Sequence, residues 1–214
     1  MISEVRDHWD WRPNWRPGRS FYTWHVIFPD DAVLIDLHDA YQRLVGSLPG
    51  ITPVPVQWLH LALQGIGFVD KVPQADLGPI VEAAQRRLEY FRPFEIKLGP
   101  AVVDVESLQL PVTPVDRLRR LRAQLRAAVT DVWGRDSVPT LPELNPHISL
   151  GYWNHTAPAA PLRQRVNALP GSTATTHLTQ VSLLTLTGDH HHYEWTTHTT
   201  LALGARTQQP EANP

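Results

Sequence analysis

The chain has 214 residues, of which 42% are hydrophobic and 19% charged, with no cysteine and a formal net charge of −2. Such a composition is typical of a globular protein, and the lack of cysteine excludes structural disulfides, thiolate catalysis and cysteine-ligated zinc. Proteins that follow a long duplex carry a basic excess, which this chain lacks, so a small phosphorylated substrate or the end of an RNA fits better than a long duplex. Without a signal segment or a long apolar run, we expect a cytoplasmic protein that does not contact membranes.

The elements of the first half of the chain are predicted from apolar spacing and from the residues that end each segment. Residues 1–20 form an arm rich in tryptophan, arginine and proline. Residues 21–28 predict a strand, and residues 30–48 predict a helix that a Pro-Gly pair ends. A strand over residues 54–66 contains one histidine motif, and residues 79–91 predict a second helix.

The second half of the chain repeats this order. After a strand pair at residues 94–111, a helix starts at a Thr-Pro-Val-Asp capping box, residues 113–116, and ends before Gly134. A second histidine strand, a short helix and a hairpin follow, at residues 146–153, 161–168, 178–186 and 193–203. The repeat predicts an internal duplication, so that residues 21–204 form one bilobal domain and residues 205–214 a flexible tail.

Two of the predicted strands carry the same order of residue types, His-Leu-Ala-Leu in one and His-Ile-Ser-Leu in the other. Side chains alternate between the faces of a strand, so His60 shares a face with Ala62, and His147 shares a face with Ser149. Two such faces brought together place two imidazoles and a hydroxyl in one cleft. Because histidine exchanges protons near neutral pH, this is an acid–base pair suited to phosphate esters.

These motifs and their flanking elements resemble the two-histidine phosphoesterase superfamily, close to its 2′-5′ RNA ligase-like branch, over about residues 20–204. The family carries two His-x-Thr/Ser motifs; His147 and Ser149 match the second, whereas Ala62 departs from the hydroxyl of the first. Tyr152 matches a position that packs against the bound nucleotide in some relatives. The resemblance implies an α+β fold, with two pseudo-symmetric lobes of antiparallel sheet, outer helices and a central cleft that holds His60 and His147.

The resemblance also implies a chemistry. It is the metal-independent hydrolysis of 2′,3′-cyclic phosphates to 2′-phosphates, with 2′-5′ ligation of RNA ends as a side or reverse activity. By analogy with relatives His147 is the base and His60 the acid, although the sequence leaves the opposite order open. No cofactor or metal is implied, the substrate is a small nucleotide or an RNA terminus, and we expect a monomer.

Further binding residues follow from strand alternation. Ala62 is expected to line the phosphate pocket, and Gln64 shares its predicted strand face and offers another polar group. Tyr22 and Trp24 share one face of the first strand. Because this strand lies beside the cleft in the family, the resemblance implies that each ring either stacks on a base or packs in the core. The arm either packs its tryptophans over the sheet or borders the cleft as a lid.

Two alternatives remain open. One is hydrolysis of another cyclic or 2′-5′-linked nucleotide, because one scaffold of this kind hosts several chemistries. The other is a nucleotide-binding module with weakened catalysis, which the missing hydroxyl at Ala62 favours.

Overall fold

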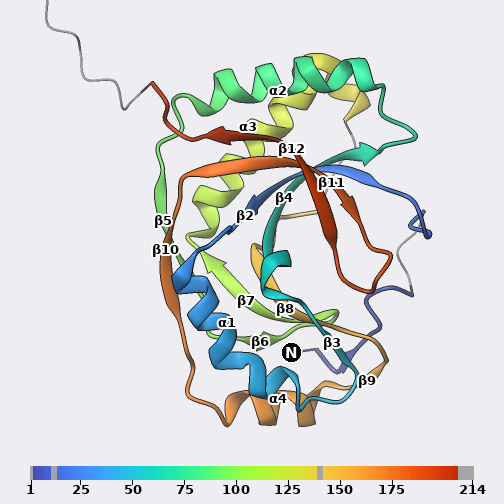
Figure 1. Cartoon of the computed structure of the whole chain (residues 1–214), viewed down its shortest axis with the longest axis vertical. Helices are drawn as coiled ribbons and strands as arrows, with labels where there is room; N and C mark the ends of the chain where they lie inside the picture. Colours follow the sequence, from blue (N-terminus) through green and yellow to red (C-terminus); the bar gives the residue numbers. More distant parts are fainter. Residues whose placement is uncertain (1, 11–13, 139–141, 207–214) are drawn as a thin grey trace, which may run out of the picture.

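The structure of the chain, a computed structural model, describes residues 2–10, 14–138 and 142–206. Within these residues ten strands form one curved antiparallel sheet, and four helices lie on its outside (Figure 1). The predicted α+β class, with an antiparallel sheet and outer helices, is therefore confirmed.

The sheet has a main path of eight strands in the order β10–β5–β7–β8–β4–β2–β11–β12. These strands are β2 (Phe21–Ile27), β4 (His60–Phe68), β5 (Phe94–Leu98), β7 (Ser107–Thr113), β8 (His147–Trp153), β10 (Ala174–Leu178), β11 (Gln180–Thr187) and β12 (Glu194–Ala202). Two short strands pair off this path, β3 (Ile51–Pro53) with β8 and β6 (Val102–Val103) with β7. The helices are α1 (Ala32–Val45), α2 (Gln74–Leu88), α3 (Val115–Trp133) and α4 (Ala159–Asn167).

The strand order divides the sheet into two matching halves. Strands β12, β11, β2 and β4 form one half, and β10, β5, β7 and β8 form the other. The two histidine strands, β4 and β8, are neighbours at the centre, where the halves meet. In Figure 1, α2 lies at one end of the molecule and α1 and α4 at the other, with the curved sheet between them.

The helices bury the apolar stripes that their spacing predicts. In α1 the buried residues recur at intervals of three and four: Leu34, Leu37, Tyr41 and Leu44. Its start is capped by Asp31, whose carboxylate accepts a hydrogen bond from the backbone N–H of Leu34 at 3.0 Å. Such a cap satisfies one of the backbone donors that a helix start leaves without a partner.

Two predicted helix starts are wrong. Helix α2 begins at Gln74, so Pro79 lies within the helix instead of at its first position. The predicted capping box of α3 does not form, because Thr113 is the last residue of β7 and Pro114 is the N-cap, without a side-chain hydrogen bond. Neither helix start has a side-chain hydrogen bond at its N-cap, which is Pro73 in α2 and Pro114 in α3.

The N-terminal arm is part of the fold. Its strand β1 (Glu4–Val5) pairs with β9 (Ala157–Pro158), and the side chain of Val5 is fully buried. Farther along the arm, the backbone N–H of His8 donates to the carbonyl of Trp153, at the end of β8, at 2.9 Å. The arm therefore lies against the half of the sheet that contains β8.

At the other end of the domain, the backbone N–H of Gly204 donates to Leu88 at the end of α2. From residue 207 on, the predicted tail lies outside the described residues. No helix in the described part of the chain is both long and apolar enough to cross a membrane.

Candidate active site

The two histidine motifs meet where the halves of the sheet join. Leu61 of β4 pairs with Ile148 of β8 in antiparallel register. In such a pair the flanking residues also face one another across the strands, which places His60 across from Ser149 and Ala62 across from His147. All four side chains line one pocket of about 410 Å³.

Both histidine strands carry an irregularity three residues after the histidine. Opposite β2, strand β4 has an extra residue at Leu63, and opposite β7, strand β8 has one at Leu150. A bulge of one residue shifts the alternation of the side chains that follow it. The fifth residue after each histidine, Gly65 in β4 and Tyr152 in β8, consequently lines the same pocket.

The tautomers of the two motif histidines are fixed by matching hydrogen bonds. His60 Nδ1 lies 2.9 Å from the carbonyl oxygen of Trp58, and His147 Nδ1 lies 2.8 Å from that of Asn145. A carbonyl oxygen only accepts, so Nδ1 carries the proton in each ring. In the neutral form of each histidine, Nε2 therefore holds the lone pair that takes up a proton.

Burial makes His60 a weak base in the free protein. Its pKa falls from 6.5 to about 4, chiefly because its ring is removed from water and further because His147 and His8 lie nearby. The hydrogen bond to Trp58 acts in the opposite direction and does not offset the burial. His60 is therefore neutral at pH 7, with Nε2 ready to accept a proton.

A further histidine, His25 of β2, stacks on His60. The ring centroids are 4.7 Å apart and the planes differ by 5°. His25 is 3% exposed, lies across from Ala62 in the β2–β4 pair and lines the pocket. Its burial, together with the nearby His60, lowers its pKa well below the usual value.

Three predicted binding residues do not line the pocket. Tyr22 and Trp24 are buried on the opposite face of β2 from Thr23 and His25, which do line it. Gln64 is buried on the core side because the bulge at Leu63 reverses its direction, and its amide nitrogen donates to the carbonyl of Gly65 at 2.8 Å. Gly65 therefore lines the pocket where Gln64 was expected to do so.

Several pocket residues were missed by sequence reasoning. The arm supplies His8 and Trp15, strand β2 supplies Phe21, Thr23 and His25, and the β11–β12 hairpin supplies Leu186 and Tyr193. Alternation along β2 groups Thr23 with His25, so strand periodicity identifies this set once the correct face is known. The expectation that the arm borders the cleft named no individual arm residue, because the place of His8 and Trp15 depends on a long-range strand pair.

Groups able to hold a metal ion were sought across the described part of the chain. No cluster of three or more histidine, cysteine, aspartate or glutamate side chains there is arranged to bind one. His190 and His192, between β11 and β12, both contact the carboxylate of Glu194, at 3.0 and 2.9 Å.

The fold and site define an α+β protein whose paired histidine strands share one pocket. The sequence profile of the 2′-5′ RNA ligase superfamily matches residues 35–190, and the chain belongs to this superfamily of two-histidine phosphoesterases. No curated protein sequence matches the chain.

Solved structures share the fold at low sequence identity. The crystal structure of TT0787 from Thermus thermophilus is 20% identical, with a TM-score of 0.62, and the match covers 86% of this chain and 98% of that one. Apo LigT from E. coli is 15% identical, with a TM-score of 0.59 over the same shares of the two chains. LigT complexed with 3′-AMP is 16% identical, also with a TM-score of 0.59, over 86% of this chain and 98% of LigT. The predicted resemblance to the two-histidine superfamily is confirmed.

Proposed function

We propose that this protein hydrolyses 2′,3′-cyclic phosphates of nucleotides or RNA ends to 2′-phosphates, without a metal ion. The observation that carries the proposal is the shared pocket in which His60, His147 and Ser149 stand together on the central strands. Hydrolysis needs one group that takes a proton from water and one that gives a proton to the leaving oxygen. The fixed Nδ1 protons leave the two Nε2 atoms for these roles.

In the proposed reaction one imidazole removes a proton from water as the water oxygen attacks phosphorus. The other imidazole protonates O3′ as the P–O3′ bond breaks, which leaves the phosphate on O2′. The Ser149 hydroxyl donates a hydrogen bond to a phosphoryl oxygen, where negative charge accumulates. The same steps with a 5′-hydroxyl RNA end in place of water break the P–O3′ bond, form a P–O5′ bond and so make a 2′-5′ linkage.

We assign the base to His60 and the acid to His147, the reverse of the order suggested by analogy with relatives. A pKa of about 4 keeps His60 in the neutral, proton-accepting form at pH 7 in the free protein. The pH profile of kcat/KM tests this order, since it reports the ionisations of the free enzyme. We expect kcat/KM to decrease on the acidic side with an apparent pKa near 4. A decrease with an apparent pKa near 6.5 contradicts the assignment.

Neighbouring structures are consistent with a nucleotide substrate. E. coli LigT, which shares the fold, was crystallised with 3′-AMP, a nucleoside monophosphate. In the present chain the pocket of about 410 Å³ has aromatic walls that include Trp15, Phe21 and Tyr152. Aromatic rings of this kind suit the stacking of a base.

The experiment compares purified, chelator-treated protein with a His60→Ala/His147→Ala double variant on all four nucleoside 2′,3′-cyclic phosphates. Conversion to 2′-phosphates by the wild type alone supports the two-histidine mechanism and its independence from metal. Equal activity of the double variant contradicts it.

A nucleotide-binding module with little catalysis is the second candidate, because Ala62 stands where the family has a hydroxyl. Tight 2′-phosphate binding without turnover favours this module. Turnover restricted to other cyclic or 2′-5′-linked nucleotides favours a related hydrolase.

A further inference from the structure

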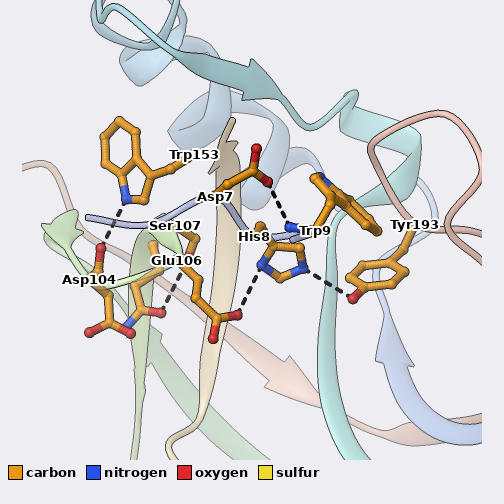
Figure 2. Close-up of polar contacts among 9 residues, drawn as sticks. Asp7, His8, Trp9, Asp104, Glu106, Ser107, Trp153 and Tyr193 are labelled. Atoms are coloured by element: carbon orange, nitrogen blue, oxygen red, sulfur yellow. Dashed lines mark hydrogen bonds and ion pairs between the residues drawn. The ribbon is translucent and has the colours of Figure 1, made fainter. Parts of the chain in front are cut away.

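A histidine of the N-terminal arm bridges the two halves of the sheet at one side of the pocket (Figure 2). His8 Nδ1 lies 3.1 Å from a carboxylate oxygen of Glu106, and its Nε2 lies 3.1 Å from the hydroxyl of Tyr193. Glu106 directly precedes β7, in the half that contains His147, and Tyr193 directly precedes β12, in the half that contains His60. The family profile matches residues 35–190, so it does not include His8.

Backbone hydrogen bonds and a ring contact hold His8 and Glu106 in place. The backbone carbonyl of Glu106 accepts a hydrogen bond from the backbone N–H of Trp153 at 3.1 Å, and the backbone carbonyl of Trp153 accepts one from the backbone N–H of His8 at 2.9 Å. The ring of His8 packs on Tyr152 with centroids 4.2 Å apart, and His8 is 4% exposed. An imidazole held in this way gives its hydroxyl partner a fixed direction.

Tyr193 stands inside the pocket, next to the histidine motif that lacks a hydroxyl. Its ring centroid is 5.9 Å from that of His60 and 5.6 Å from that of Tyr152. Ala62, in the same half of the sheet, offers no hydrogen-bond donor to a phosphate. Thr23 of β2 also lines the pocket, but its hydroxyl donates to the carbonyl of Gln64 at 3.3 Å. The half that contains His60 therefore has a second hydroxyl in Tyr193, although its motif has none.

We propose that the Tyr193 hydroxyl hydrogen-bonds a phosphoryl oxygen of the substrate, and that His8, held by Glu106, is the positioning residue that directs it. This inference rests on the proposed phosphate pocket. It names Tyr193 as the residue that donates a hydrogen bond to the phosphate from the half of the sheet that contains His60, where Ala62 stands in place of the hydroxyl of the family motif. The arm is thereby part of the active site.

The direction of the hydrogen bonds follows from the charges around His8. A carboxylate only accepts, so Nδ1–H donates to Glu106, and in the neutral ring Nε2 accepts from Tyr193. The titratable groups that face His8 include Glu106, Tyr152, Tyr193 and His60. A bound phosphate adds a second anion beside Glu106, and two anions favour the imidazolium. His8 then takes up one proton from solvent at Nε2, Nε2–H donates to the Tyr193 oxygen, and the phenolic proton is directed to the phosphate.

Isothermal titration calorimetry with two probes, 2′-AMP and inorganic phosphate, tests the inference. Tyr193→Phe removes one oxygen and keeps the ring, while Tyr22→Phe, on the opposite face of the sheet, is the matched control. We expect Tyr193→Phe to weaken the binding of both probes about ten- to a hundredfold, as for a hydrogen bond to a charged group, and the control to bind as the wild type does. Unchanged binding, loss of 2′-AMP binding alone, or no binding of either probe to the wild type overturns the inference.

A double-mutant cycle tests whether His8 acts through Tyr193. We expect His8→Phe, which keeps a ring against Tyr152, to weaken phosphate binding about as much as Tyr193→Phe, and the double variant to lose no more. Glu106→Gln leaves the arm sequence intact and is expected to lower the affinity by a smaller factor. Additive losses overturn the positioning role of His8. Because binding needs no turnover, failure of this inference is distinguishable from failure of the proposed hydrolase.

Discussion

Acidification is expected to destabilise the protein through His60. The pKa of His60 is about 4 in the folded protein, against an ordinary value of 6.5. Between these two pH values the unfolded chain binds a proton at His60 that the folded chain does not. The free energy of unfolding therefore decreases as the pH falls from 6.5 to 4, and the contribution is complete below pH 4.

The expected size follows from the width of that interval. At 1.36 kcal/mol for each pKa unit, a shift from 6.5 to about 4 corresponds to about 3 kcal/mol. Since His60 borders the pocket and is partly exposed, this value is an upper bound. A loss of that size is a large fraction of the 5–15 kcal/mol by which domains are typically stable, so about 3 kcal/mol is readily measured.

The assay is urea unfolding at pH 7, 6, 5 and 4 for the wild type, His60→Gln and His177→Gln. His177 is exposed on β10, away from the pocket, and its variant is expected to follow the wild type. Between pH 7 and pH 4 the free energy of unfolding of the wild type is expected to decrease by up to about 3 kcal/mol more than that of His60→Gln. Parallel curves for these two proteins refute the idea that burial holds His60 neutral.

Three further predictions concern the pocket. Ala62→Thr restores a hydroxyl at an exposed position and is expected to raise kcat/KM on cyclic phosphates. Ala62→Val, which has a similar shape but no hydroxyl, is expected to leave kcat/KM unchanged. Equal kcat/KM values for the two variants argue against a phosphate beside residue 62. Ser149→Ala is expected to lower kcat about 10²–10³-fold with unchanged unfolding, and a kcat within twofold of wild type excludes the proposed donor. Deletion of residues 1–18 removes His8, Trp15 and the buried Val5, and is expected to raise KM and lower the unfolding midpoint; an unchanged KM separates the arm from the site.

Two kinds of sequence information are enough to predict the central residues of the candidate site: strand alternation and the resemblance to the family. Strand alternation puts His60 with Ala62 and His147 with Ser149, and the resemblance to two-histidine enzymes brings the two strands together. The same alternation fails at Gln64, since a bulge depends on pairing with β2 and has no local signal.

Tyr22 and Trp24, expected either to stack on a base or to pack in the core, are buried away from the pocket, and the reason that the sequence left both places open is a different one. Periodicity groups the residues of β2 into two faces but does not say which face meets the cleft. That depends on where β4 and the helices pack, which involves residues far apart in the chain. The wall formed by the arm depends on the same kind of long-range contact.

The repeated bulges show how two halves with little sequence likeness build one pocket. Three residues after each histidine, an extra residue shifts the strand, so the fifth residue after it faces the pocket in both halves. In β8 this residue is Tyr152, whereas in β4 it is Gly65, where a Cβ atom would lie 2.9 Å from the ring of Phe21. The glycine thus leaves room for Phe21 of the next strand. Each half therefore presents an aromatic ring to the pocket: Tyr152 comes from the histidine strand β8 itself, and Phe21 comes from β2, the neighbour of the histidine strand β4. The two halves share the position of the bulge in the backbone, although the residues at that position differ.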